Sequence, residues 1–250
     1  MRGRRRDRRE AVGRGGRSEG VGAQGEGWKA RGSDRIDMMK RDAWKGLLGA
    51  AGADVGPGAM SALRKHIELV REWNHVVSLV SRRDVGKLFE AHVIDSLSLA
   101  PILVELGAGR GKRLLDIGSG GGFPGIPLKI VLPELALVLV ERSERKVGFL
   151  RRAVGMLGLQ GVDVLWGQFP AEWRTADRAD FVTARAVERP QRVGKAILKL
   201  VKAGAVFLCQ SGDPTSWVGE GFHVEHVEDD WSRAGFRRGP LHLIRAETPS

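Results

Sequence analysis

The chain has one cysteine, Cys209, among its 250 residues, and no apolar run of the length that crosses a membrane. A transmembrane helix needs about 20 consecutive apolar residues, so we expect no contact with a membrane. One thiol cannot form an internal disulfide or a thiolate metal cluster, so we expect no metal site and a reducing, cytoplasmic location. The N-terminus has arginines with no apolar stretch behind them, so we expect no secretory signal.

Apolar residues make up 42% of the chain, enough for a substantial core, and the net charge is +11. A strongly basic chain favours a polyanionic partner. Residues 1–42 carry 13 Lys or Arg against 7 Asp or Glu and show no apolar period, so we expect a disordered basic tail. This tail is either an arm that binds RNA or a non-essential extension, with Met38 or Met39 as the true start.

The rest of the chain divides by its pattern. Residues 43–106 repeat apolar residues at helical spacing, which predicts a small helical cap subdomain. Residues 107–250 alternate apolar runs with helical stretches, which predicts an α/β domain with a parallel sheet covered on both faces. The expected strands are 113–117, 135–140, 162–166, 180–184 and 205–210, with weaker ones at 222–227 and 241–245.

A glycine-rich turn follows the first expected strand, and Glu141 stands at the end of the second. Glycines at 118, 120 and 122 let a backbone approach a ligand closely, and Glu141 can accept two ribose hydroxyls. The dinucleotide spacing and the P-loop motif are both absent. Asp116, directly before the turn, would repel a pyrophosphate but suits the amino group and sulfonium of S-adenosylmethionine.

Several strings then carry a family resemblance: DIGSGGGFPGIPL at 116–128, ERSERKVGFL at 141–150, TARA at 183–186, and upstream Trp73-Asn74 with HVIDSL at 92–97. The chain resembles the glucose-inhibited division protein B family, the guanine-N7 methyltransferases of small-subunit (16S) ribosomal RNA, over about residues 60 to 245. The resemblance implies a class I S-adenosylmethionine-dependent methyltransferase, with a Rossmann-like seven-stranded sheet and an N-terminal helical cap.

The resemblance also implies a cofactor pocket. Gly118 and Phe123 would line the methionine and adenosine region, and Glu141 would bind the ribose. The element that contacts the adenine falls at Ala171-Glu172, with Phe169-Pro170 as the other placement, and the family's arginine is absent there. The full set expected around S-adenosylmethionine is Asp116, Gly118, Gly120, Gly122, Phe123, Glu141, Ala171, Glu172 and Arg185.

Guanine N7 has a free lone pair and loses no proton on methylation, so the reaction needs orientation and no general base. A cysteine nucleophile is not expected, because Cys209 lies in an apolar strand and predicts a buried structural role. The string that usually accompanies methylation of exocyclic amines is also absent after the fourth strand.

Cations near the expected pocket are candidates for RNA contact: Arg142, Arg145, Lys146 and Arg185. Arg185 alternatively pairs with an interior acid such as Asp116, and the cations of 142–152 alternatively form a solvated helix face. His92 is expected to be structural, with Asp95 one turn away, and Trp73 to be core.

We expect a monomer whose partner is ribosomal RNA or an assembling small-subunit particle. Two other functions stay open: a methyltransferase for small molecules or proteins, and an RNA-binding module without activity.

Overall fold

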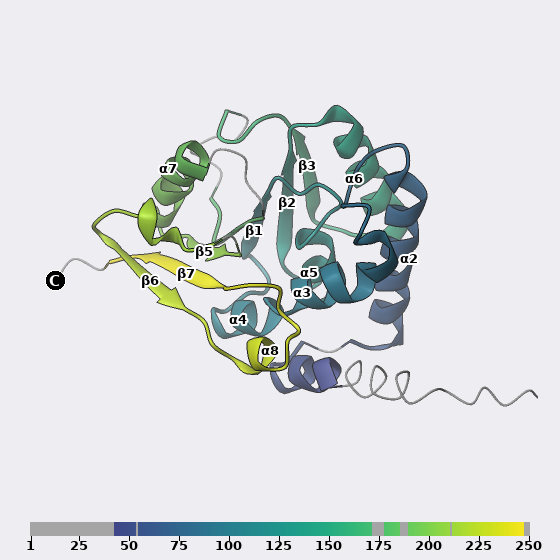
Figure 1. Ribbon diagram of the computed structural model, residues 1–250, viewed down its shortest axis with the longest axis horizontal. Coiled ribbons are helices and arrows are strands. Elements are labelled where there is room, and N and C mark those ends of the chain that lie inside the picture. Colours follow the sequence, from purple (N-terminus) through teal and green to yellow (C-terminus); the bar gives the residue numbers. More distant parts are fainter. Residues whose placement is uncertain (1–42, 54, 172–177, 186–189, 211, 248–250) are drawn as a thin grey trace, which may run out of the picture.

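The computed structural model describes residues 43–53, 55–171, 178–185, 190–210 and 212–247 (Figure 1). The predicted tail, residues 1–42, lies outside them. Helices come first along the chain: residues 43–50, α2 (Pro57–Asn74), η1 (Val85–Lys87), η2 (Phe89–Ile94), α3 (Asp95–Leu97) and α4 (Ala100–Glu105). Among the described residues, no helix has the length and apolarity to cross a membrane.

Seven strands form one sheet in the order β3-β2-β1-β4-β5-β7-β6. They are β1 (Arg113–Ile117), β2 (Ala136–Glu141), β3 (Val162–Trp166), β4 (Phe181–Ala184), β5 (Val206–Cys209), β6 (Phe222–His226) and β7 (His242–Ala246). Every strand expected from the sequence is present, and no end differs by more than one residue. Because β1 pairs in parallel with both β2 and β4, the carboxyl ends of these three strands meet at one edge.

The sheet is mixed, so the prediction of a wholly parallel sheet is wrong for its last strand. β7 runs antiparallel to both of its neighbours, β5 and β6. The connection between β6 and β7 holds only the short helix α8 (Asp230–Arg233) and turns back at the same end of the sheet. A chain that reverses in this way produces an antiparallel pair, whereas a parallel pair needs a crossover to the other end.

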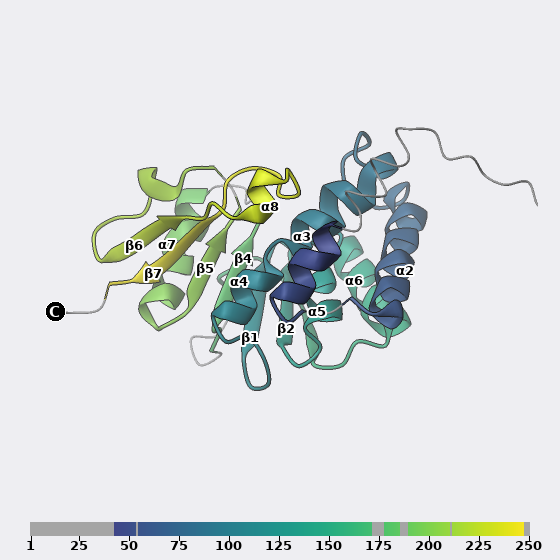
Figure 2. The same ribbon diagram turned by 90° about the horizontal axis from the view of Figure 1, so that it is seen from below.

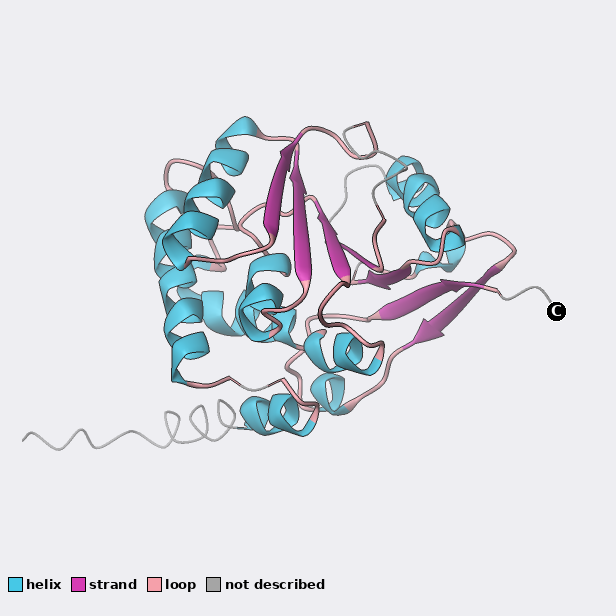
Figure 3. Ribbon diagram, turned by 180° about the vertical axis from the view of Figure 1, so that it is seen from behind, coloured by secondary structure: helices cyan, strands magenta, loops and turns pink. Residues whose placement is uncertain are grey.

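Helices cover both faces of the sheet (Figure 2, Figure 3). Side chains alternate between the faces along each strand. Leu115 of β1 joins the cluster beneath α7 (Pro190–Lys202), whereas Leu114 joins the cluster that includes residues of α2, α5 (Gly125–Val131) and α6 (Glu144–Leu157). By the same alternation, Asp116, Glu141 and Thr183 point to the face that carries α5 and α6.

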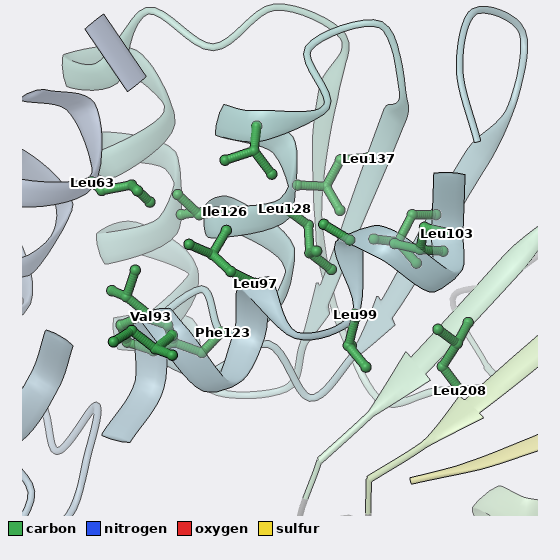
Figure 4. Packing of buried hydrophobic residues seen from close by; sticks show 14 of the residues in the cluster. Leu63, Val93, Leu97, Leu99, Leu103, Phe123, Ile126, Leu128, Leu137 and Leu208 are labelled. Atoms are coloured by element: carbon green, nitrogen blue, oxygen red, sulfur yellow. The ribbon is translucent and has the colours of Figure 1, made fainter. Parts of the chain in front are cut away.

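The N-terminal helices pack directly on that face. One continuous hydrophobic cluster contains Leu63 of α2, Leu97 of α3 and Leu103 of α4, together with Leu128 of α5 and Leu137 of β2. Figure 4 shows these side chains in a single packed layer. The helical residues therefore help to bury the sheet, and the division into a cap (43–106) and a methyltransferase domain (107–250) stays a prediction.

Core side chains lie where the apolar pattern of the sequence predicts them. The stripe from Leu63 to Val70 is buried in α2 as expected, and Trp73 packs against the same cluster, so its core role is confirmed. Pro101 stands in the first turn of α4, where a proline costs no helical hydrogen bond. Cys209 is buried in the apolar strand β5, as predicted.

Candidate cofactor and substrate site

The glycine turn lies between β1 and α5, at the edge where β1, β2 and β4 end. Gly118, Gly120 and Gly122 have φ of +75°, +55° and +84°, values that favour glycine. The N–H groups of Gly118 and Ser119 donate to the carbonyl of Val140 at 2.8 and 3.2 Å. The turn is therefore fastened to the neighbouring strand β2 and held in one shape.

The glycines serve different purposes. A Cβ at Gly118 would meet nothing within 4 Å, so this position faces open space. At Gly122 a Cβ would lie 2.5 Å from Cδ1 of Ile126, and at Gly125 it would lie 2.7 Å from Leu139. Interior packing explains Gly122 and Gly125, whereas Gly118 leaves room for a ligand. The predicted cofactor contacts of Gly118, Gly120 and Gly122 stay predictions.

Glu141 ends β2 and turns its carboxylate toward the glycine turn. Its Oε2 accepts the N–H of Gly120 at 3.0 Å, and its Oε1 accepts the N–H of Ser143 at 2.9 Å. The side chain is buried, yet each oxygen keeps a further lone pair. The carboxylate is thereby oriented at the glycine turn, and its predicted contact with ribose hydroxyls stays a prediction.

Asp116 lies beneath the turn and is bonded to protein groups. It is 1% exposed, its Oδ2 accepts the N–H of Gly125 at 3.3 Å, and its Oδ1 accepts the hydroxyl of Thr183 at 3.2 Å. Burial raises the pKa of Asp116 to about 6, although these hydrogen bonds oppose the rise. Asp116 thus joins the start of α5 to β4, and its predicted attraction for an amino group stays a prediction.

Phe123 packs between two histidines that sequence reasoning did not place together. Its ring centroid is 4.8 Å from that of His66 and 5.0 Å from that of His92. Nε2 of His66 lies 2.9 Å from the carbonyl oxygen of Gly121, so this nitrogen carries the hydrogen and donates. Burial lowers the pKa of both histidines to about 4, aided at His92 by the charge of Arg185.

Arg185 follows β4 and pairs with an interior acid, as the alternative interpretation had it, but that acid is Asp95 and not the example Asp116. Its Nη2 lies 2.5 Å from Oδ2 of Asp95. His92 lies 3.4 Å from Asp84 through Nε2, so its acidic partner is Asp84 and not Asp95. The sequence carried no signal for these pairs, because Arg185 and Asp95 are 90 residues apart.

The predicted RNA-contacting cations lie at the start of α6 and just before it. Arg142 and Arg145 are exposed, and Lys146 is half-buried. Sequence reasoning missed Trp166, which is 55% exposed and pairs in register with Glu141. Its indole N–H donates to the carbonyl of Arg142 at 3.2 Å. An exposed aromatic ring is therefore fixed beside the backbone of Arg142.

The predicted adenine-contacting element is described only in part. Ala171 is exposed, and Glu172 lies outside the described residues. Of the other placement, Phe169-Pro170, Phe169 is buried among the residues beneath α7 and Pro170 is exposed. Both placements of the adenine contact stay predictions.

Comparison with known proteins assigns the chain to a family. Residues 59–216 match GidB, described as rRNA small subunit methyltransferase G. A relative named ribosomal RNA small subunit methyltransferase G, from Symbiobacterium thermophilum, is 32% identical over 236 residues, which cover 85% of this chain and 94% of the relative. A relative of the same name from Methylococcus capsulatus is 35% identical over 165 residues, which cover 66% of this chain and 77% of the relative.

Solved structures share the fold. An O-methyltransferase from Bacillus cereus in complex with SAH has a TM-score of 0.53 and 16% identity, covering 82% of this chain and 97% of that one. A putative O-methyltransferase from Klebsiella pneumoniae has a TM-score of 0.52 and 16% identity, covering 84% of this chain and all of that one, 100%. These structures support the methyltransferase fold class predicted from the sequence.

The family match spans more than half of the chain and includes the glycine turn, Glu141 and Arg185. The resemblance stated from the sequence strings is thereby confirmed. The chain belongs to the GidB family of rRNA small subunit methyltransferases.

Proposed function

We propose that the protein transfers a methyl group from S-adenosylmethionine to N7 of a guanine in small-subunit (16S) ribosomal RNA. The observation that carries the cofactor site is the position of Glu141, whose carboxylate is bonded to Gly120 beside the open space at Gly118. Family membership supports the methyl transfer and the ribosomal RNA substrate.

The residues at this edge fit the proposed cofactor. Glu141 would accept the ribose hydroxyls, Gly118 and Gly120 would admit the ligand against the backbone, and Phe123 would border the methionine and adenosine region. Ala171, Glu172 and Arg185 are the other proposed contacts, with Asp116 and Gly122 supporting the turn from below. The bound cofactor would supply a methyl group on a positively charged sulfur.

The chain's own contribution to the chemistry is positioning. Guanine N7 attacks with its lone pair, so an N–C bond forms while the C–S bond breaks, and no proton leaves the base. Holding two reactants in line can be worth roughly 7–11 kcal/mol of the barrier. Consistent with this, the one thiol, Cys209, is buried in β5 on the face beneath α7, away from the face that carries Glu141.

We assign the RNA-facing surface to the start of α6 and the end of β3. Arg142, Arg145 and Lys146 would contact phosphates, and the exposed ring of Trp166 would stack on a base. Trp166 of β3 pairs in register with Glu141 of β2 at the carboxyl ends of these strands, so this surface adjoins the proposed cofactor site.

The finer points of the proposal are a monomer in the cytoplasm that acts on an assembling small-subunit particle or on naked RNA. Methyl transfer from radiolabelled S-adenosylmethionine to naked 16S ribosomal RNA and to purified small subunits would tell these two substrates apart. Gel filtration with light scattering would measure the oligomeric state.

The central test is chemical mapping of the ribosomal RNA. Borohydride and aniline cleave RNA at N7-methylguanosine, so primer extension on RNA from a deletion strain should lose one stop that the parent strain shows. Complementation with the wild-type gene should restore the stop, and a Glu141→Ala gene should not. Persistence of every stop in the deletion strain would reject the proposal, and label found in protein instead of RNA would favour a protein methyltransferase.

A further inference from the structure

We propose that Asp95 is a positioning residue of the cofactor site, which holds the Arg185 guanidinium so that one of its N–H groups can bind the carboxylate of the cofactor's methionine part. The inference rests on the proposed function. Asp95 belongs to α3, outside the glycine turn. No pattern in the sequence connected it with the cofactor site.

Each carboxylate oxygen of Asp95 accepts a hydrogen bond from an arginine. Its Oδ2 accepts Nη2 of Arg185 at 2.5 Å, and its Oδ1 accepts the backbone N–H of Arg238 at 2.6 Å. The side chain is 1% exposed. Two fixed donors and complete burial allow this carboxylate one orientation, and Arg185 inherits that orientation through the pair.

Arg185 has a donor left over. Within the described part of the chain, its Nη1 is buried and has no hydrogen-bond partner. A buried N–H without an acceptor is unfavourable by about 1–3 kcal/mol, so this donor calls for an acceptor that a ligand can supply. Ala184, the residue before Arg185, pairs in register with Ile117, the residue before Gly118. Arg185 therefore leaves the sheet beside the open space at Gly118.

The chemistry of the surroundings favours a carboxylate as the missing acceptor. A guanidinium recognises a carboxylate with paired, charged hydrogen bonds. S-adenosylmethionine carries one carboxylate, and the acid Asp116 beneath the turn would favour the adjacent amino group. The charge of Arg185 also lowers the pKa of Asp116 and of His92, so the guanidinium is close enough to both groups to act on their protonation.

The Asp95 pair is connected to the C-terminal part of the sheet. Arg238 reaches Asp95 through its backbone, and its Nη1 donates to the carbonyl of Ala91 at 3.2 Å. The preceding Arg237 is buried and pairs with Asp229 at 2.6 Å, and its Nη2 donates to the carbonyl of Ser98 at 3.2 Å. Arg238, which lies in the connection between β6 and β7 and beyond the family match at 59–216, thus holds the carboxylate that holds Arg185, whereas the Arg237–Asp229 pair is a separate link from the same connection to Ser98.

The test compares two ligands by isothermal titration calorimetry on the full chain. S-adenosylmethionine has the carboxylate, and 5′-methylthioadenosine has the same adenosine without it. Asp95→Asn keeps the size of the side chain and an oxygen for the Arg238 N–H, but it replaces the acceptor of Arg185 by an amide. We expect this variant to lose about 10-fold to 100-fold in affinity for S-adenosylmethionine, the range that one charged hydrogen bond to a ligand is worth. Its affinity for 5′-methylthioadenosine should equal that of the wild type.

Asp229→Asn is the matched control, because it makes the same chemical change at the carboxylate that holds Arg237. It should lower the melting temperature about as much as Asp95→Asn and leave both affinities unchanged. In an Arg185→Gln background, Asp95→Asn should produce no further loss, because the residue it positions is gone.

The outcomes separate this role from the proposed function. Failure of the wild-type chain to bind either ligand would reject the proposed function. With wild-type binding intact, the role of Asp95 is overturned by an unchanged affinity for S-adenosylmethionine, by an equal loss for both ligands, or by a full additional loss in the Arg185→Gln background.

Discussion

Oε2 of Glu141 accepts the backbone N–H of Gly120 at 3.0 Å, which joins the end of β2 to the turn after β1. The N–H of Ser143 donates to the other carboxylate oxygen, Oε1, at 2.9 Å. Hydrogen bonds on both oxygens therefore fix the carboxylate against the glycine turn. Any ligand that binds Glu141 meets a carboxylate whose direction is already fixed, which lowers the entropy lost on binding.

Replacement of Glu141 by alanine should weaken S-adenosylmethionine binding. Each charged hydrogen bond lost costs about 1.5–3 kcal/mol, which corresponds to roughly tenfold to a hundredfold in the dissociation constant. Calorimetry on Glu141→Ala measures the loss. Glu144→Gln is the control, because Glu144 is an exposed acid at the start of α6, and it should bind like the wild type. Equal affinities for wild type and Glu141→Ala would move the ribose site elsewhere.

Alanine at Gly122 and at Gly118 should produce opposite patterns. Both positions have positive φ, so each substitution strains the backbone by about 1 kcal/mol or more. Only Gly122→Ala adds a steric conflict, with a Cβ 2.5 Å from Ile126, and such overpacking costs about 1–3 kcal/mol. Urea unfolding should show the larger loss of stability for Gly122→Ala. Calorimetry should show the larger loss of affinity for S-adenosylmethionine in Gly118→Ala, because the added Cβ would occupy the open space proposed for the ligand.

Equal losses of stability in the two variants would contradict this division of roles. The control is Gly148→Ala on the exposed face of α6, where a Cβ meets nothing within 4 Å and φ is helical. Alanine is favoured over glycine within a helix by about 1 kcal/mol, so this variant should be at least as stable as the wild type.

The strands and the glycine turn could be predicted because their signals are local. Continuous apolar runs such as 136–140 identify a buried strand, and the acid that follows a run is placed at the sheet edge by chain order alone. The direction of β7 could not be read in this way, because an antiparallel strand leaves no mark in its own residues. It depends on where the connection after β6 turns back.

The contacts of the site depend on tertiary packing and were predicted less well. Asp95 lies one turn after His92, which suggested a local pair, but α3 directs Asp95 toward Arg185 and Arg238. His66 reaches Gly121 from 55 residues away, which no spacing rule anticipates. Trp166 was seen only as the last residue of a strand, since exposure at an edge strand is decided by which helix covers it.

Stability should fall as the pH drops from 6.5 to 4, in part through His66. Burial lowers the pKa of His66 from 6.5 to about 4, so between these values the unfolded chain binds a proton that the folded chain does not. The full shift corresponds to about 3 kcal/mol, lost as the solution becomes more acidic through this window. The lowered pKa of His92 likewise reduces the free energy of unfolding as the pH falls. The raised pKa of Asp116 has the opposite effect, because the folded chain binds that proton more tightly than the unfolded chain does.

His66→Gln isolates the contribution of His66, because glutamine has a neutral donor for the carbonyl of Gly121. Urea unfolding at pH 7 and pH 4.5 gives the change in unfolding free energy for each protein. The change should be smaller in His66→Gln than in the wild type. His75→Gln, a substitution at an exposed histidine, should leave the change as it is in the wild type. An identical pH dependence in wild type and His66→Gln would show that His66 is not held neutral.

The proposed RNA-facing surface makes phosphate contacts, which weaken as the salt concentration rises, and a stacking contact, which does not depend on salt. Removing a phosphate contact lowers the dependence of log K on log salt by about 0.7–0.9, so Arg142→Ala with Arg145→Ala should flatten that dependence. Stacking is worth about 1–3 kcal/mol per base and involves no counterion, so Trp166→Ala should weaken RNA binding at every salt concentration with the slope unchanged. Fluorescence anisotropy with a labelled 16S fragment measures both effects.

The matched control for the cations is Arg110→Ala. Arg110 pairs with Glu134 at 2.9 Å, is 89% exposed and lies before β1, at the opposite end of the strands from Glu141. This variant should keep the wild-type slope, whereas equal flattening in Arg110→Ala would mean that charge acts over the whole surface.

For Trp166 the decisive measurement is cofactor affinity. If Trp166→Ala weakens S-adenosylmethionine binding and leaves RNA binding intact, the ring borders the adenine, because its register partner Glu141 belongs to the same cofactor site.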